Sequence, residues 1–118
     1  MSASDNSNDA VNIKELKEIM DDDMELIQDC FADFIEEWPQ QYVEIKGAVL
    51  EKNAPILDAS AHKLKGTLRY LAAKDAADAA YALESAGKEN NMADVEQKLS
   101  TLKDACQRVV DYINNFNQ

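Results

Sequence analysis

Glycine, proline and long apolar runs are scarce in this chain. Its 118 residues include only three glycines and two prolines, and no apolar run approaches the roughly 20 residues that a membrane-spanning helix needs. Alanine, leucine, lysine and glutamate are common, a composition that favours helices over sheets. We see no strand signal and no internal repeat. The length fits one domain with a modest core and is too short for a catalytic domain plus a regulatory one.

Basic residues are also few, because 12 Lys and Arg face 23 Asp and Glu, for a net charge of −11. Such a charge argues against nucleic acid as a partner and disfavours an anionic membrane surface. The acids are unevenly spread, however. None occurs between Ala59 and Lys74, a stretch that carries four cations. This local patch indicates a docking site for an anionic group, although chance clustering on a solvated helix face is the ordinary alternative.

Cysteine and histidine are too rare for a metal site built from them. Cys30 and Cys106 lie far apart without metal-ligand spacing, and His62 is the only histidine, so structural zinc is excluded. The cysteines are expected to be reduced residues in or beside the core of a cytoplasmic protein.

The Ser/Asn/Asp-rich start lacks the regions of a signal peptide. We predict a disordered tail over residues 1–10 and one domain over residues 11–118.

The apolar residues recur every three or four positions and predict five helices. Their expected spans are Asn12–Met20, Asp21–Lys52 with the three aspartates as its start, Asn53 to about Ala72–Lys74, Asp75–Lys88, and Met92–Phe116. The second keeps its phase through Pro39, which can kink it because proline lacks a backbone donor. Two helices meeting at Trp38–Pro39 are the alternative. Gly87 and Asn90–Asn91 mark the end of the fourth.

Four long amphipathic helices joined by short links make an antiparallel four-helix bundle the expected all-α fold, with a short extra helix at the N-terminus. His62 falls on the third of the five predicted helices. At roughly 100° per residue it shares a face with Lys65, Gly66 and Arg69. A separate apolar face lies about a third of a turn away; it consists of Leu57, Ala61, Leu64, Leu68 and Leu71. The imidazole therefore lies beside the core stripe and not in it.

Few chemistries suit a lone exposed histidine. A Ser-His-Asp or Cys-His arrangement needs a nucleophile and an oxyanion site that such a bundle barely offers, and no Gly-rich phosphate loop is present. What remains is the imidazole itself as a nucleophile that is transiently phosphorylated.

The residues around His62 suit a phosphoryl group. Lys65 can neutralise a phosphoryl oxygen, and Arg69 extends the positive surface. Gly66 costs roughly 1 kcal/mol in a helix interior, which suggests that space is needed beside the ring. Each residue alone has an ordinary explanation: a surface histidine, a solvated lysine, a close helix contact. Their combination at this spacing favours the phosphoryl site.

The segment also resembles a known family. The run His62-Lys63-Leu64-Lys65-Gly66-Thr67, followed by Leu71-Ala72-Ala73 and Leu83-Glu84, is similar to the histidine-containing phosphotransfer (HPt) domain of bacterial phosphorelays. The stretch Met24–Leu50, with its aromatic residues and Pro39, is similar to that family's first long helix. Two positions depart from the family pattern. Leu68 replaces a residue that is often small, and Ala72 replaces a glycine, which puts the left-handed helix stop in question.

The resemblance implies a four-helix bundle whose His62 accepts the phosphoryl group, with Lys65 as phosphate-side cation and Gly66 as the clearance position. Glu84 matches a position that faces the histidine from the neighbouring helix, where a carboxylate could hold one ring N–H. The family relays phosphoryl groups between aspartates of receiver domains and has no kinase activity of its own. The implied partners are response-regulator receiver domains and a hybrid sensor histidine kinase.

We therefore expect a free-standing phosphorelay intermediate without a cofactor of its own, with magnesium supplied by the receiver's acidic pocket. Lys63, Lys65 and Arg69 are expected to contact the docked receiver. The alternatives are an adaptor that binds receiver or kinase domains without carrying phosphate, and a plain helical interaction module whose histidine is incidental. The sequence does not identify the cognate kinase, the receiver or the direction of phosphate flow.

Overall fold

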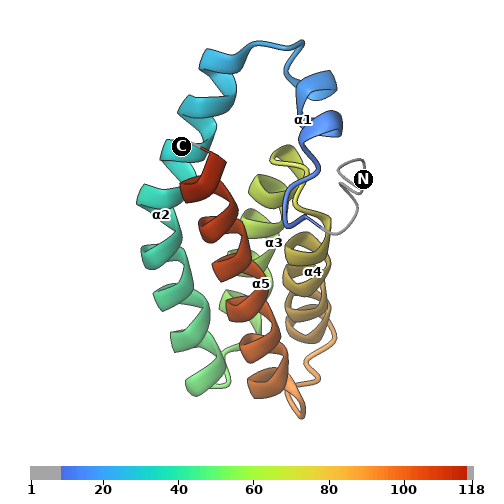
Figure 1. Ribbon diagram of the computed structural model, residues 1–118. Coiled ribbons are helices and arrows are strands. Elements are labelled where there is room, and N and C mark those ends of the chain that lie inside the picture. Colours follow the sequence, from blue (N-terminus) through green and yellow to red (C-terminus); the bar gives the residue numbers. More distant parts are fainter. Residues whose placement is uncertain (1–8, 117–118) are drawn as a thin grey trace.

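The computed structural model describes residues 9–116, so most of the predicted tail, residues 1–10, lies outside the described part. The described residues form five helices and no strand. These are α1 (Ile13–Ile19), α2 (Met24–Leu50), α3 (Ala54–Tyr70), α4 (Lys74–Lys88) and α5 (Val95–Phe116). The four long helices run alternately up and down (Figure 1), and α2 and α5 contact each other as well as their neighbours in sequence, so that the ring closes. The antiparallel four-helix bundle with a short N-terminal helix is confirmed.

Short polar side chains begin the first three helices. The Oδ1 atoms of Asn12, Asp23 and Asn53 each accept a hydrogen bond from the backbone N–H three residues on, at 3.0, 3.0 and 3.2 Å. These contacts satisfy donors that have no partner within the helix. The predicted starts of α1, α2 and α3 are confirmed, and Pro55 lies in the first turn of α3 as expected.

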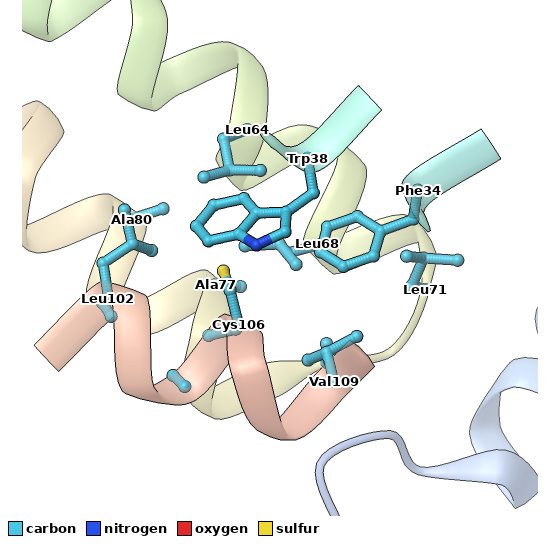
Figure 2. Packing of buried hydrophobic residues seen from close by; sticks show 14 of the residues in the cluster. Phe34, Trp38, Leu64, Leu68, Leu71, Ala77, Ala80, Leu102, Cys106 and Val109 are labelled. Atoms are coloured by element: carbon cyan, nitrogen blue, oxygen red, sulfur yellow. The ribbon is translucent and has the colours of Figure 1, made fainter. Parts of the chain in front are cut away.

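Helix α2 continues through Pro39 without interruption, so the alternative of two helices meeting at Trp38–Pro39 is wrong. The buried face of α2 supplies the aromatic part of the core. The rings of Phe34 and Trp38 are stacked with centroids 6.0 Å apart. Figure 2 shows the indole of Trp38 among side chains of the other three long helices, including Leu64 and Cys106. Apolar contact on both sides of Pro39 thus holds the helix together despite the missing backbone donor.

Left-handed residues other than glycine end the helices. Lys52, Ala72 and Asn90 have φ angles of 56°, 58° and 55° and follow α2, α3 and α4. The next N–H in each case reaches back to a carbonyl in the last turn, as from Ala73 to Leu68 at 2.9 Å. This is the Schellman arrangement, in which glycine is the usual residue. The helix stop that Ala72 put in question is therefore kept, in a conformation that is unfavourable for alanine.

Replacing Lys52 by glycine is expected to stabilise the fold by about 0.5–1 kcal/mol. Glycine adopts a positive φ without the clash of a Cβ atom, and this gain exceeds the loss of a favourable charge at the helix end. Lys52 is exposed, so no buried contact is lost. The free energy of unfolding from denaturant titration checks the prediction. Ala32→Gly is the control, because the same loss of Cβ at an exposed interior position of α2 should destabilise the protein by about 1 kcal/mol.

The fourth helix ends at Lys88, as predicted, and Gly87 lies in its last turn, where it is buried. A Cβ atom at Gly87 would lie 2.6 Å from the backbone nitrogen of Asp58 and 2.7 Å from the carbonyl oxygen of Ala54, so this glycine permits close packing of α4 on α3. Helix α5 begins at Val95 and not at Met92. Met92 follows the apolar rhythm because it packs on the core from the preceding loop.

The two cysteines lie where the sequence predicted. Cys106 is fully buried and Cys30 is half-buried, and both are free thiols. Burial raises the pKa of the Cys106 thiol to about 12, so this residue packs as a small apolar side chain. Within residues 9–116, no helix is both long and apolar enough to cross a membrane.

Candidate functional site

His62 lies in the middle of α3 with its side chain 66% exposed. The neighbouring positions Ala61 and Leu64 are fully buried in the core. The ring therefore stands beside the apolar stripe, as the helical spacing predicted, and a second protein can reach it.

A buried carboxylate holds one nitrogen of this ring. The Nδ1 atom of His62 lies 2.8 Å from Oε2 of Glu84, which projects from α4 and is only 3% exposed. An ionised carboxylate can only accept hydrogen bonds, so Nδ1 carries the proton of this contact. In the neutral ring, Nε2 then has the free lone pair. The contact fixes both the tautomer and the orientation of the imidazole.

Glu84 is also the anion for two lysines. Lys65 Nζ lies 2.7 Å from Oε1, and Lys88 Nζ lies 3.7 Å from Oε2. Burial raises the pKa of the Glu84 carboxyl, but the contacts with Lys65 and His62 outweigh it and lower the pKa below its usual value. Glu84 is therefore ionised at neutral pH, as an acceptor for the ring N–H must be.

Lys65, predicted as the cation on the phosphate side, is paired with a carboxylate of the protein itself. Its side chain is only 10% exposed, and its ammonium group lies 5.1 Å from the centre of the Tyr81 ring in addition to its pairing with Glu84. The stem of Lys65 is thus buried between α3 and α4. This placement could not be read from α3 alone, because both contacts come from α4.

Gly66 is exposed and has open space where a side chain would stand. A Cβ atom added to it would meet nothing within 4 Å. The open space that the sequence suggested next to His62 is therefore present, one turn along α3 from the ring.

The sequence of the chain matches a protein-family model. The model described as "Hpt domain" matches residues 29–112, which run from α2 to near the end of α5. The chain belongs to the Hpt domain family. Hpt domains are carriers of phosphoryl groups on histidine in phosphorelays, where they interact with receiver domains and kinases, and they are not in general kinases themselves. The comparisons with curated proteins and with solved structures give no match.

The remaining predicted residues of the Hpt site lie apart from the His62–Glu84 contact. Lys63 lines a hollow of about 440 Å³ on the side of α2, together with Glu36, Glu37 and other polar residues of that helix. Arg69 lines a separate hollow of about 410 Å³ beside α1, with Glu15 and Lys74. Of the residues named from the sequence, the structure brings His62 and Lys65 into contact with one carboxylate, that of Glu84, and the open position of Gly66 lies next to His62 on α3.

Lys88 and Tyr81 were not predicted from the sequence. Both belong to α4, and both contact the charged cluster. A signal for Lys88 was available, because it lies four residues after Glu84 and such pairs face each other on a helix. Tyr81 precedes Glu84 by three residues and therefore shares the same face.

Replacing Gly66 by alanine is expected to stabilise the Hpt domain while slowing phosphotransfer. Helix propensity favours alanine by about 1 kcal/mol, and the added methyl group meets nothing in the free protein. In the complex it would occupy space beside the attacking ring, where an error of about 1 Å in position can reduce a rate by roughly a hundredfold. Denaturant unfolding and the rate of transfer from a phosphorylated receiver measure the two effects.

Gly47→Ala is the matched control for this variant. Gly47 is a second helical glycine at which an added Cβ atom would have no neighbour within 4 Å, but it belongs to α2. The control should gain similar stability and keep the wild-type transfer rate. An unchanged rate in Gly66→Ala would remove the proposed clearance role.

Proposed function

We propose that His62 accepts a phosphoryl group from the phospho-aspartate of one receiver domain and passes it to an aspartate of another. The lone pair of Nε2 attacks phosphorus, the bond between phosphorus and the aspartate oxygen breaks, and the carboxylate leaves with the bonding electrons. The reverse steps phosphorylate the second receiver. The proton on Nδ1 stays on the ring and faces Glu84 throughout, so the positive charge that the ring acquires is stabilised beside a carboxylate.

The observation that carries this proposal is the contact between the exposed ring of His62 and the buried Glu84. An exposed imidazole that was free to rotate could turn either nitrogen toward a partner. The contact with Glu84 occupies Nδ1 and leaves Nε2 as the nitrogen that can react. A non-phosphorylated adaptor has no need for a buried carboxylate that orients the histidine.

The proposed partners are receiver domains of response regulators and of a hybrid sensor histidine kinase, in a cytoplasmic relay. Lys63 and Arg69 flank His62 on α3, are exposed, and would contact the docked receiver. Magnesium would belong to the acidic pocket of the receiver, and the chain itself would need no cofactor.

Transfer of labelled phosphate from a receiver tests this function. The full chain is incubated with a panel of receivers phosphorylated on aspartate, and the label that it acquires is exposed to acid and to alkali. A phosphoramidate on histidine is expected to be lost in acid and kept in alkali, whereas an acyl phosphate on aspartate would be hydrolysed in alkali. Binding of receivers without any transfer of label would support the adaptor and overturn the proposal.

A further inference from the structure

Two lysines share the carboxylate of Glu84, but their surroundings differ. The side chain of Lys65 is 10% exposed, contacts Oε1 at 2.7 Å and lies over the Tyr81 ring. The side chain of Lys88 is 65% exposed and only approaches Oε2, at 3.7 Å. Lys65 is thus fixed by two contacts in a buried place, whereas Lys88 is held loosely at the surface and can move at little cost in free energy.

Lys88 and His62 also share one oxygen of Glu84. The oxygen that Lys88 approaches is Oε2, the same atom that accepts the hydrogen bond from the His62 ring, whereas Lys65 pairs with the other oxygen. The ammonium group of Lys88 and the imidazole therefore lie against the same carboxylate oxygen, and the Lys88 side chain is exposed there.

The balance of charges around Glu84 indicates a role for Lys88. Before the reaction, two lysines face one carboxylate and a neutral ring, which leaves the cluster with one positive charge in excess. A phosphoryl group on Nε2 carries close to two negative charges, while the ring acquires one positive charge, so the site as a whole becomes more negative by about one charge. If Lys65 stays paired with Glu84, the excess charge is that of Lys88.

We propose that Lys88 is the cation that neutralises the phosphoryl group on His62, and that Lys65 is a positioning residue that holds Glu84 in place under the ring. This inference rests on the proposed function of His62. On phosphorylation the Lys88 ammonium leaves Oε2 and binds a phosphoryl oxygen, while Lys65 keeps its contacts with Glu84 and Tyr81. No bond is formed or broken by either lysine.

The test uses the full chain phosphorylated with phosphoramidate, a small donor that needs no partner protein. Because His62 is the only histidine, the phosphorus-31 resonance of phosphohistidine reports on this site alone. The variants are Lys88→Ala, Lys88→Arg and Lys74→Ala. Lys74 is the matched control, since it is an exposed lysine of the same helix that also pairs with an acid four residues away, about 21 Å along the axis from Lys88.

A cation close to the phosphoryl group favours its doubly charged form. The titration midpoint of the resonance in Lys88→Ala is therefore expected to lie higher than in the wild type, by about 0.5 pH unit. Lys88→Arg should restore most of the difference, and Lys74→Ala should titrate like the wild type. An unchanged midpoint in Lys88→Ala, or equal shifts in Lys88→Ala and Lys74→Ala, would overturn the role of Lys88.

Thermal unfolding of variants distinguishes the proposed roles of Lys65 and Lys88. Lys65→Met removes a buried partner of Glu84 and should lower the melting temperature, whereas Lys88→Ala should leave it close to the wild-type value. Equal losses would overturn the division of roles. A wild-type chain that gives no phosphohistidine signal and accepts no label from any receiver would instead refute the proposed function itself, and the role of Lys88 with it.

Discussion

A variant in which glutamine replaces His62 is expected to accept no phosphate while keeping the bundle intact. Glutamine has no nitrogen lone pair that can attack phosphorus, and the chain has no second histidine to take its place. The side chain is 66% exposed, so its loss leaves no cavity. The amide group can still donate a hydrogen bond to Glu84, and the free energy of unfolding should change by less than about 1 kcal/mol.

Label transfer from a phosphorylated receiver and circular dichroism measure these two properties on the same preparation. The wild type and Gly47→Ala serve as the reference chains for transfer. Retention of label on the glutamine variant would mean that another residue accepts the phosphoryl group, and His62 would lose its role. A loss of helical signal in that variant would show that the ring stabilises the bundle far more than its exposure indicates.

Gly87→Ala is expected to destabilise the protein by about 2 kcal/mol or more. The new Cβ atom would lie within 3 Å of two backbone atoms of α3, which are not free to move as a side-chain end is. Such overpacking typically costs 1–3 kcal/mol, and the gain in helix propensity offsets only part of it. Gly47→Ala, the same change at a position without close neighbours, should stabilise the fold. Denaturant unfolding of both variants measures the contrast.

The same substitution should also slow phosphotransfer. Gly87 lies three residues after Glu84, on the face of α4 that packs on α3, so a displacement of α4 moves the carboxylate away from the ring of His62. The nitrogen-15 shifts of the imidazole should then indicate a loss of the fixed tautomer. A Gly87→Ala chain as stable as the wild type would show that the two helices can separate freely, and the contact at Gly87 would not hold Glu84 in register.

The sequence was most informative where one helix carries the whole pattern. The spacing of His62, Lys65 and Gly66 on α3 correctly predicted an exposed ring with open space next to it, and the apolar phase of α2 correctly indicated that Pro39 does not break the helix. In both cases the residues that decide the outcome are local neighbours on one periodic element.

The failures concern distances between helices. Gly87 was interpreted only as a marker of the helix end, and only the approach of the α3 backbone shows that it also permits close packing of α4 on α3. The pairing of Lys65 with Glu84 likewise depends on the relative placement of α3 and α4, which a periodic pattern leaves open. Lys88 was missed for the same reason, although its spacing from Glu84 offered a clue.

The match to the family begins at residue 29, inside α2, yet the packed unit begins earlier. Val11, Leu16 and Met20 are almost completely buried, and the N–H of Asn12 donates to the carbonyl of Ala72 at the turn between α3 and α4. The segment before α2 thus seals one end of the bundle. A fragment or fusion designed on the boundaries of the family signature would uncover apolar surface there, so the unit to transplant starts ahead of Val11.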